Sequence, residues 1–188
     1  MTYDIAIIGG GSIGAAAFYK IQKAYPDLKI LLIEKEKGLA DHQTGNNSGV
    51  IHSGLYYKPG SSKAKYCVEG RHELVAFAKE HGIDHDVCGK VVVATSEKAL
   101  PFMDQIFENG IANNTEGLKK ITGEEIKDYE PDVVGIAGIW VPCTGIIDYR
   151  QATEKMVEVS LKLQPKSKIL LGTEAKVFHH EEGQTVIE

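Results

Sequence analysis

The feature that most constrains the fold is a glycine-rich turn between a short apolar run and a helical segment. Residues 3–8 are a nearly continuous apolar stretch of β-branched character, typical of a strand buried in a parallel sheet. Gly9, Gly11 and Gly14 follow with the spacing G-x-G-x-x-G. In this spacing the first glycine allows a tight turn, the second lets the backbone approach a diphosphate, and the third lets the helix pack on the strand. The pattern predicts the start of a dinucleotide-binding fold.

The residues that follow extend this prediction to a strand, helix and strand. Residues 12–25 are predicted to form a helix, whose free N–H groups and partial positive charge at the start suit a diphosphate. Residues 29–35 predict a second strand. Glu34 lies about twenty residues after the last glycine, where a carboxylate can accept hydrogen bonds from both hydroxyls of an adenosine ribose. The fingerprint alone leaves NAD and FAD open.

Composition excludes several classes of function. The chain has 188 residues and a net charge of −5, so it can bury one good core or two small ones, and we expect no general affinity for nucleic acid. Its three cysteines are far apart and form no C-x-x-C pair, which favours reduced thiols in a cytoplasmic protein without a metal site. No signal peptide or transmembrane segment is expected, so any membrane contact would be peripheral, at the inner membrane.

The order of predicted elements indicates an interrupted domain. We expect a nucleotide-binding domain of residues 1–80 and 145–188, with an inserted α+β domain of residues 81–144. In the strand order 3-2-1-4 the three predicted parallel strands fill half of a sheet and leave the first strand as a bare edge, so the sequence is expected to be truncated. Other expected elements are helices at 64–81, 97–109 and 149–163, a short capped helix from Thr122, strands at 88–96, 136–142 and 168–171, and a hairpin of 174–177 with 184–187.

Residues 44–61 are the most unusual segment of the chain. Glycine, asparagine and serine are dense in this segment, yet apolar and aromatic residues are interleaved with them, so it is too apolar for a solvated linker. We interpret it as a helix start and a following turn packed against a buried group. An irregular packed loop without a ligand is the alternative.

Three stretches carry a resemblance to a known family: QTGNNSGVIHSGLYYKPGSSKAKYCVEG, CGKVVVAT and PCTGIIDYRQ. With them the chain resembles the L-2-hydroxyglutarate dehydrogenase/oxidase family of the D-amino-acid-oxidase-like FAD-dependent oxidoreductases. The resemblance implies a Rossmann-like, glutathione-reductase-type FAD-binding domain with an inserted α+β substrate domain that contains a mixed sheet. It also implies oxidation of L-2-hydroxyglutarate to 2-oxoglutarate by hydride transfer to flavin N5. Members of the family are about twice as long, so the chain would be an N-terminal half.

Candidate cofactor-binding residues lie in the glycine turn and in the unusual segment. A helix start at residues 46–50 would offer N–H groups to the electron-rich edge of the flavin. Val177 is expected, from the resemblance only, to offer its backbone to adenine. The full set is Gly9, Gly11, Ser12, Ile13, Gly14, Glu34, Lys35, Thr44, Asn46, Asn47, Ser48, Gly49, Val50 and Val177.

His52 is the candidate catalytic base, because its usual pKa suits proton abstraction near neutrality. A structural histidine, a covalent flavin link through His52 and a base outside this chain are the alternatives. The substrate is expected to be a small 2-hydroxy acid whose carboxylates need cations, and the electron acceptor would be oxygen or a membrane quinone. Candidate substrate-binding residues are Tyr57, Lys58, Lys65 and Arg71, with Lys63, Lys90 and Arg150 as further cations.

Other functions stay open at this point. An FAD-dependent oxidoreductase acting on glycerol 3-phosphate or on an amine such as glycine would keep the same cofactor. A non-catalytic nucleotide-binding fragment belongs to a different class. An NAD-dependent dehydrogenase is disfavoured, because nothing in the NAD fold requires the segment from Thr44 to Lys58.

Overall fold

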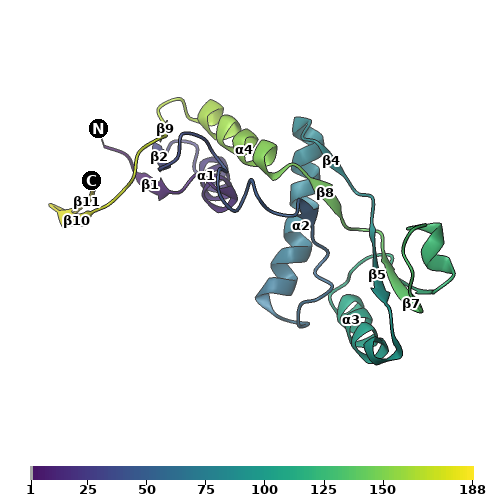
Figure 1. Cartoon of the computed structure of the whole chain (residues 1–188). Coiled ribbons are helices and arrows are strands. Elements are labelled where there is room, and N and C mark those ends of the chain that lie inside the picture. The colour runs from purple at the N-terminus through teal and green to yellow at the C-terminus, as the bar shows by residue number, and fades with distance from the viewer. Residues whose placement is uncertain (1) are drawn as a thin grey trace. The chain divides into compact units, whose positions relative to one another are not determined.

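The computed structural model of the chain describes residues 2–188, which form two compact units (Figure 1). Unit 1 contains the residues before Gly49 together with Asp148–Glu188, and unit 2 is the continuous segment Gly49–Ile147. The boundary expected at residue 80 is therefore corrected to residue 48. The physical reason is that helix α2 (Ser62–His81) finds its partners, among them Glu116, within unit 2.

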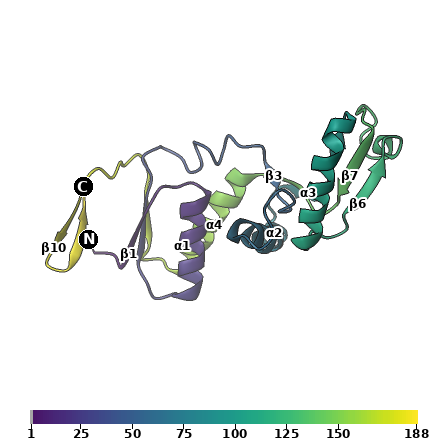
Figure 2. The same ribbon diagram turned by 90° about the horizontal axis from the view of Figure 1, so that it is seen from below.

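Unit 1 is built on a parallel sheet in the order β1-β2-β9. The strands are β1 (Ile5–Ile8), β2 (Ile30–Ile33) and β9 (Lys168–Leu170). Helices α1 (Ser12–Ala24) and α4 (Tyr149–Leu163) lie side by side against the sheet (Figures 1 and 2). The order confirms the α/β, Rossmann-like arrangement predicted from the glycine turn.

The core of unit 1 lies between this sheet and the two helices. Ala15 and Phe18 of α1, Ile30 and Leu32 of β2, and Val157 of α4 are almost completely buried. Full burial of a large apolar side chain contributes about 1.5–3 kcal/mol, so these contacts account for much of the stability of the unit.

Strand β1 is at the edge of the sheet, as predicted. Within residues 2–188 it pairs only with β2, and its Ile8 is 49% exposed. A hairpin of β10 (Phe178–Glu181) and β11 (Gln184–Ile187) follows β9. The expected first strand, 174–177, is wrong by four residues. The turn lies at Glu182 and Gly183, both with positive φ, and a two-residue turn places Phe178 opposite Ile187.

Unit 2 contains two sheets of three strands each. In the first, α3 (Leu100–Ala112) packs on the antiparallel strands β5 (Lys90–Ala94), β7 (Ala137–Val141) and β6 (Lys119–Thr122) (Figure 2). Its core is formed by Leu55, Ala94, Met103, Ile106, Ile139 and Val141. Every strand pair described in this unit is antiparallel, so the implied mixed sheet is not observed in residues 49–147.

The second sheet joins β3 (Val50–Ile51), β8 (Gly145–Ile147) and β4 (His85–Asp86). Next to it, α2 begins after Ser61, whose hydroxyl accepts from the N–H of Ala64, and ends at Gly82 in the left-handed conformation. Two short 3-10 helices, η1 (Glu97–Ala99) and η2 (Glu125–Asp128), complete the unit. The latter carries the predicted capping box, since Thr122 and Glu125 exchange backbone-to-side-chain hydrogen bonds.

Candidate functional site

Two positions at the turn after β1 can be occupied only by glycine. Gly9 has φ +104°, a conformation that L side chains rarely adopt. A Cβ atom on Gly14 would lie 1.9 Å from the carbonyl oxygen of Gly9, so α1 can approach the turn only because position 14 has no side chain. These two roles agree with the predicted fingerprint.

The N-terminus of α1 is open to an anion. Gly11 is the N-cap and provides no side-chain hydrogen bond, and the N–H of Ser12 donates to Thr44 Oγ1 at 3.0 Å. A pocket of about 460 Å³ covers the helix start, and Ile13 at its rim is 86% exposed. The partial positive charge of the helix start and the glycines beneath it suit a diphosphate. The pocket brings together the predicted residues Gly9, Gly11, Ser12, Ile13, Gly14, Thr44 and Asn47.

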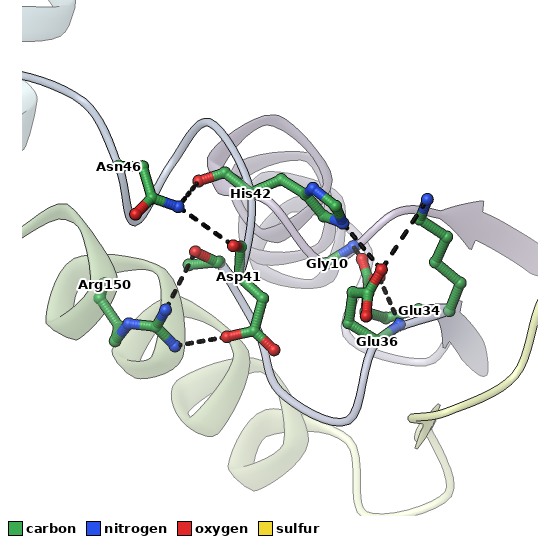
Figure 3. A network of polar contacts seen from close by, with 9 residues as sticks. Gly10, Glu34, Glu36, Asp41, His42, Asn46 and Arg150 are labelled. Atoms are coloured by element: carbon green, nitrogen blue, oxygen red, sulfur yellow. Dashed lines mark hydrogen bonds and ion pairs between the residues drawn. The ribbon is translucent and has the colours of Figure 1, made fainter.

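Glu34 lies directly after β2 and is buried against the turn. Its Oε2 accepts from the N–H of Gly10 at 2.5 Å, and its Oε1 accepts from the N–H of Glu36 at 2.8 Å (Figure 3). Each carboxylate oxygen keeps a second lone pair, so ribose hydroxyls can still be accepted. Lys35 is exposed, with its Nζ 3.8 Å from Glu36 Oε1.

A network that the sequence did not reveal fixes the loop after Glu34 (Figure 3). Arg150 of α4 donates to the carbonyl of Leu39 and to Asp41 Oδ1, both at 2.9 Å. His42 Nε2 lies 2.8 Å from Glu36 Oε1. Arg150 was expected to be a cation for substrate carboxylates, but here its guanidinium positions the loop that carries Thr44. No local pattern in the sequence could identify this pairing, because the partners lie over a hundred residues apart.

The helix start expected at residues 46–50 is wrong. Asn46 Nδ2 donates to the carbonyl of His42 at 2.8 Å, and Asn47 Nδ2 donates to the carbonyl of Thr44 at 2.9 Å, so the asparagines stabilise turns. Gly49 then has φ +68°, which no helix permits, and Val50 begins strand β3. Ser48 is exposed at the end of this turn region.

Val177 does not present a free backbone donor. Its N–H donates to the carbonyl of Glu188 at 3.1 Å, and its carbonyl accepts from the N–H of Glu188 at 3.0 Å. Only the second lone pair of that carbonyl is available to an adenine amino group. Of the backbone contact with adenine that the family resemblance implies, only a hydrogen bond accepted by the carbonyl of Val177 is therefore possible.

In unit 2, His52 follows β3 and is exposed. Burial of part of its ring, followed by the positive charge of Lys90, lowers the pKa of His52. The imidazole is therefore neutral near pH 7 and able to accept a proton. The backbone carbonyl of His52 accepts a hydrogen bond from Cys67 Sγ at 3.4 Å, which links the loop after β3 to α2.

The predicted substrate-binding residues of unit 2 have different environments. Lys58 and Lys65 are exposed, and Tyr57 is half-buried. Arg71 has a side chain only 3% exposed, and its Nη2 donates to Glu116 Oε2 at 3.1 Å. Its Nη1 has no hydrogen-bond partner within residues 2–188. Arg71 thus packs inside the unit, whereas the two lysines are accessible.

The comparison with known families defines the class of protein. The sequence profile of the family described as FAD dependent oxidoreductase, abbreviated DAO, matches residues 4–188. The chain belongs to this family, and FAD is the family's cofactor. The start of α1, whose N-cap Gly11 provides no side-chain hydrogen bond, fits the diphosphate of that cofactor.

Individual relatives narrow the comparison. The L-2-hydroxyglutarate dehydrogenase of Indibacter alkaliphilus is 51% identical over 158 residues, which are 84% of this chain and 40% of that protein. The mitochondrial L-2-hydroxyglutarate dehydrogenase of Homo sapiens is 47% identical over 80% of this chain and 32% of its own length. The chain thus spans about a third to two fifths of these relatives.

Solved structures support the fold. The FAD-bound L-alpha-glycerophosphate oxidase from Mycoplasma pneumoniae superposes with a TM-score of 0.90 at 28% identity, covering all of this chain and 49% of that one. Glycine oxidase from Geobacillus kaustophilus gives a TM-score of 0.84 at 18% identity over 98% of this chain and 50% of that one.

Among the helices of residues 2–188, none has the length and the apolar composition that a membrane span requires.

Proposed function

We propose that this chain is the nucleotide-binding part, and a portion of the substrate-binding part, of an FAD-dependent enzyme that oxidises L-2-hydroxyglutarate to 2-oxoglutarate. The observation that carries the proposal is the identity of 44–51% to relatives named L-2-hydroxyglutarate dehydrogenase over 84% of the chain. The glycine turn and Glu34 support it, because they provide what the ADP portion of FAD requires.

In this proposal unit 1 binds the nucleotide. The N–H groups at the start of α1 bind the diphosphate. Gly9 allows the tight turn before the helix, and Gly14 lets the helix pack against that turn. Glu34 accepts from the ribose hydroxyls while its bonds to Gly10 and Glu36 hold it in place. Arg150 keeps the loop with Thr44 next to the helix start.

Unit 2 acts on the substrate in this proposal. When bound, FAD supplies the hydride acceptor for the reaction. His52, neutral because burial and Lys90 lower its pKa, takes the proton of the C2 hydroxyl as the hydride leaves C2. Lys58 and Lys65 are proposed cations for the carboxylate remote from C2, and Tyr57 is proposed to line the site.

The electron acceptor and the location are part of the proposal. Electrons would pass to oxygen or to a membrane quinone, and oxygen uptake and quinone reduction assays separate these two routes. The protein would work in the cytoplasm or peripherally at the inner membrane, which cell fractionation tests.

The test of the function is anaerobic mixing of the natural protein that carries this sequence, loaded with FAD, with each enantiomer of 2-hydroxyglutarate. Bleaching of the visible flavin absorbance by the L-form alone is expected. No bleaching by the L-form contradicts the proposal, and preferential bleaching by glycerol 3-phosphate or glycine supports the alternative substrates. Failure to retain FAD supports a non-catalytic nucleotide-binding protein.

A further inference from the structure

Lys90 is held on a rigid part of unit 2. It is the first residue of β5, where it lies opposite Val141 of β7. The preceding Gly89 has φ +77°, and a Cβ atom there would lie 2.2 Å from the ring of Trp140. The N–H of Gly89 also donates to the carbonyl of Thr144 at 2.9 Å. The backbone at Lys90 is thus fixed on both sides.

The charge of Lys90 is not compensated by an acid of the described chain. Its Nζ lies 4.6 Å from the centroid of the Tyr56 ring, at cation–π distance. None of the ion pairs in residues 2–188 involves Lys90. The nearby thiols of Cys67 and Cys143 are neutral, because burial raises the pKa of both. Burial of half of an ammonium group costs free energy of folding, because the charge loses water. An anionic ligand would offset this cost.

The charge of Arg71, the other cation near these thiols, is already compensated. Its Nη2 donates to Glu116, although Nη1 has no partner within residues 2–188, and its side chain is only 3% exposed. Lys58 and Lys65 are exposed. Lys90 instead lies against Tyr56, which is in the same loop as His52 and four residues after it, and the positive charge of Lys90 is the second cause that lowers the pKa of His52. Lys90 is therefore the cation that is coupled to the candidate base.

The geometry of a 2-hydroxy acid requires such a pair. Its hydroxyl and its first carboxylate are carried by adjacent carbon atoms, so a base for the hydroxyl and a cation for the carboxylate must lie near one another. We propose that Lys90 binds the carboxylate bonded to the carbon that is oxidised, and that Tyr56 holds its ammonium group in position. This inference rests on the proposed 2-hydroxy acid oxidation and identifies the residue that recognises the acid.

The test is an NMR titration of the 188-residue protein with L-2-hydroxyglutarate and with L-lactate, following the His52 imidazole and the Lys90 ε-methylene signals. L-lactate has the hydroxyl and the adjacent carboxylate but no second carboxylate. Loss of a charge-assisted hydrogen bond in Lys90→Met should weaken the binding of both acids about tenfold or more. Lys90→Arg should restore most of the affinity, which separates the loss of charge from misfolding.

Lys79→Met is the matched control, because it removes an exposed lysine from α2 of the same unit. Unchanged affinities in Lys90→Met, an equal loss in Lys79→Met, or a loss confined to L-2-hydroxyglutarate would each overturn the proposal. Flavin reduction does not enter the measurement. A protein that binds both acids through Lys90 but is not bleached by L-2-hydroxyglutarate contradicts the proposed function and leaves the Lys90 assignment standing.

Discussion

A single methyl group at position 14 would prevent α1 from packing against the turn after β1. The added Cβ would lie 1.9 Å from the Gly9 carbonyl oxygen, a backbone atom that cannot rotate away. We expect Gly14→Ala to destabilise unit 1 by about 1–3 kcal/mol and to weaken the binding of ADP. Urea unfolding and ADP titration measure the two effects.

Gly70→Ala is the control for this substitution. Gly70 lies in α2, and a Cβ atom there would have nothing within 4 Å. Alanine should therefore stabilise α2 by about 0.5–1 kcal/mol through helix propensity alone. If the two variants lost stability equally, steric closure at Gly14 would not be the cause.

At the scale of elements, α4 depends on its cap. The Asp148 Oδ1 atom accepts from the N–H of Gln151 at 2.9 Å. Asp148→Ala should cost about 1 kcal/mol of stability, whereas Asp148→Asn should keep most of the cap. Thermal unfolding of the three proteins checks this order, and equal melting temperatures for all three would contradict it.

The same helix has an acid-sensitive ion pair cluster. Hydrogen bonds from Lys155 and Lys162 lower the pKa of Glu158 from 4.5 to about 2. Because the folded-state pKa is lowered, the contribution to stability is complete above pH 4.5 and is lost as the pH falls towards about 2. NMR titration of the Glu158 carboxylate should give a midpoint near 2, and Lys162→Ala should raise it. A midpoint of 4.5 in both proteins would exclude the pairing.

Elements also show what a sequence can and cannot predict. The apolar runs and the glycine turn predicted β1, α1 and β2, because each pattern is local. Strands β3 and β8 were missed, since Val50 pairs with Ile146 and two or three residues carry no periodicity of their own. Lys90 could not be distinguished from the other cations in the sequence, because its contact with Tyr56 depends on the fold and not on sequence spacing.

On the scale of the whole molecule, each unit has its own buried core. A ligand that binds only the folded state adds about 2.7 kcal/mol at a hundred times its dissociation constant. We expect ADP to slow hydrogen exchange in β2 of unit 1 and to leave β7 of unit 2 unchanged. Protection of both strands by the same factor would show that the units unfold together.

The two ends of unit 2 are joined to each other. The N–H of Ile147 donates to the carbonyl of Gly49 at 2.8 Å, and Val50 pairs with Ile146. The first and last residues of this segment therefore lie side by side. Another segment whose ends are equally close could replace it without a change in the conformation of the flanking residues. Its loops can then vary in sequence while the glycine turn of unit 1 stays the same.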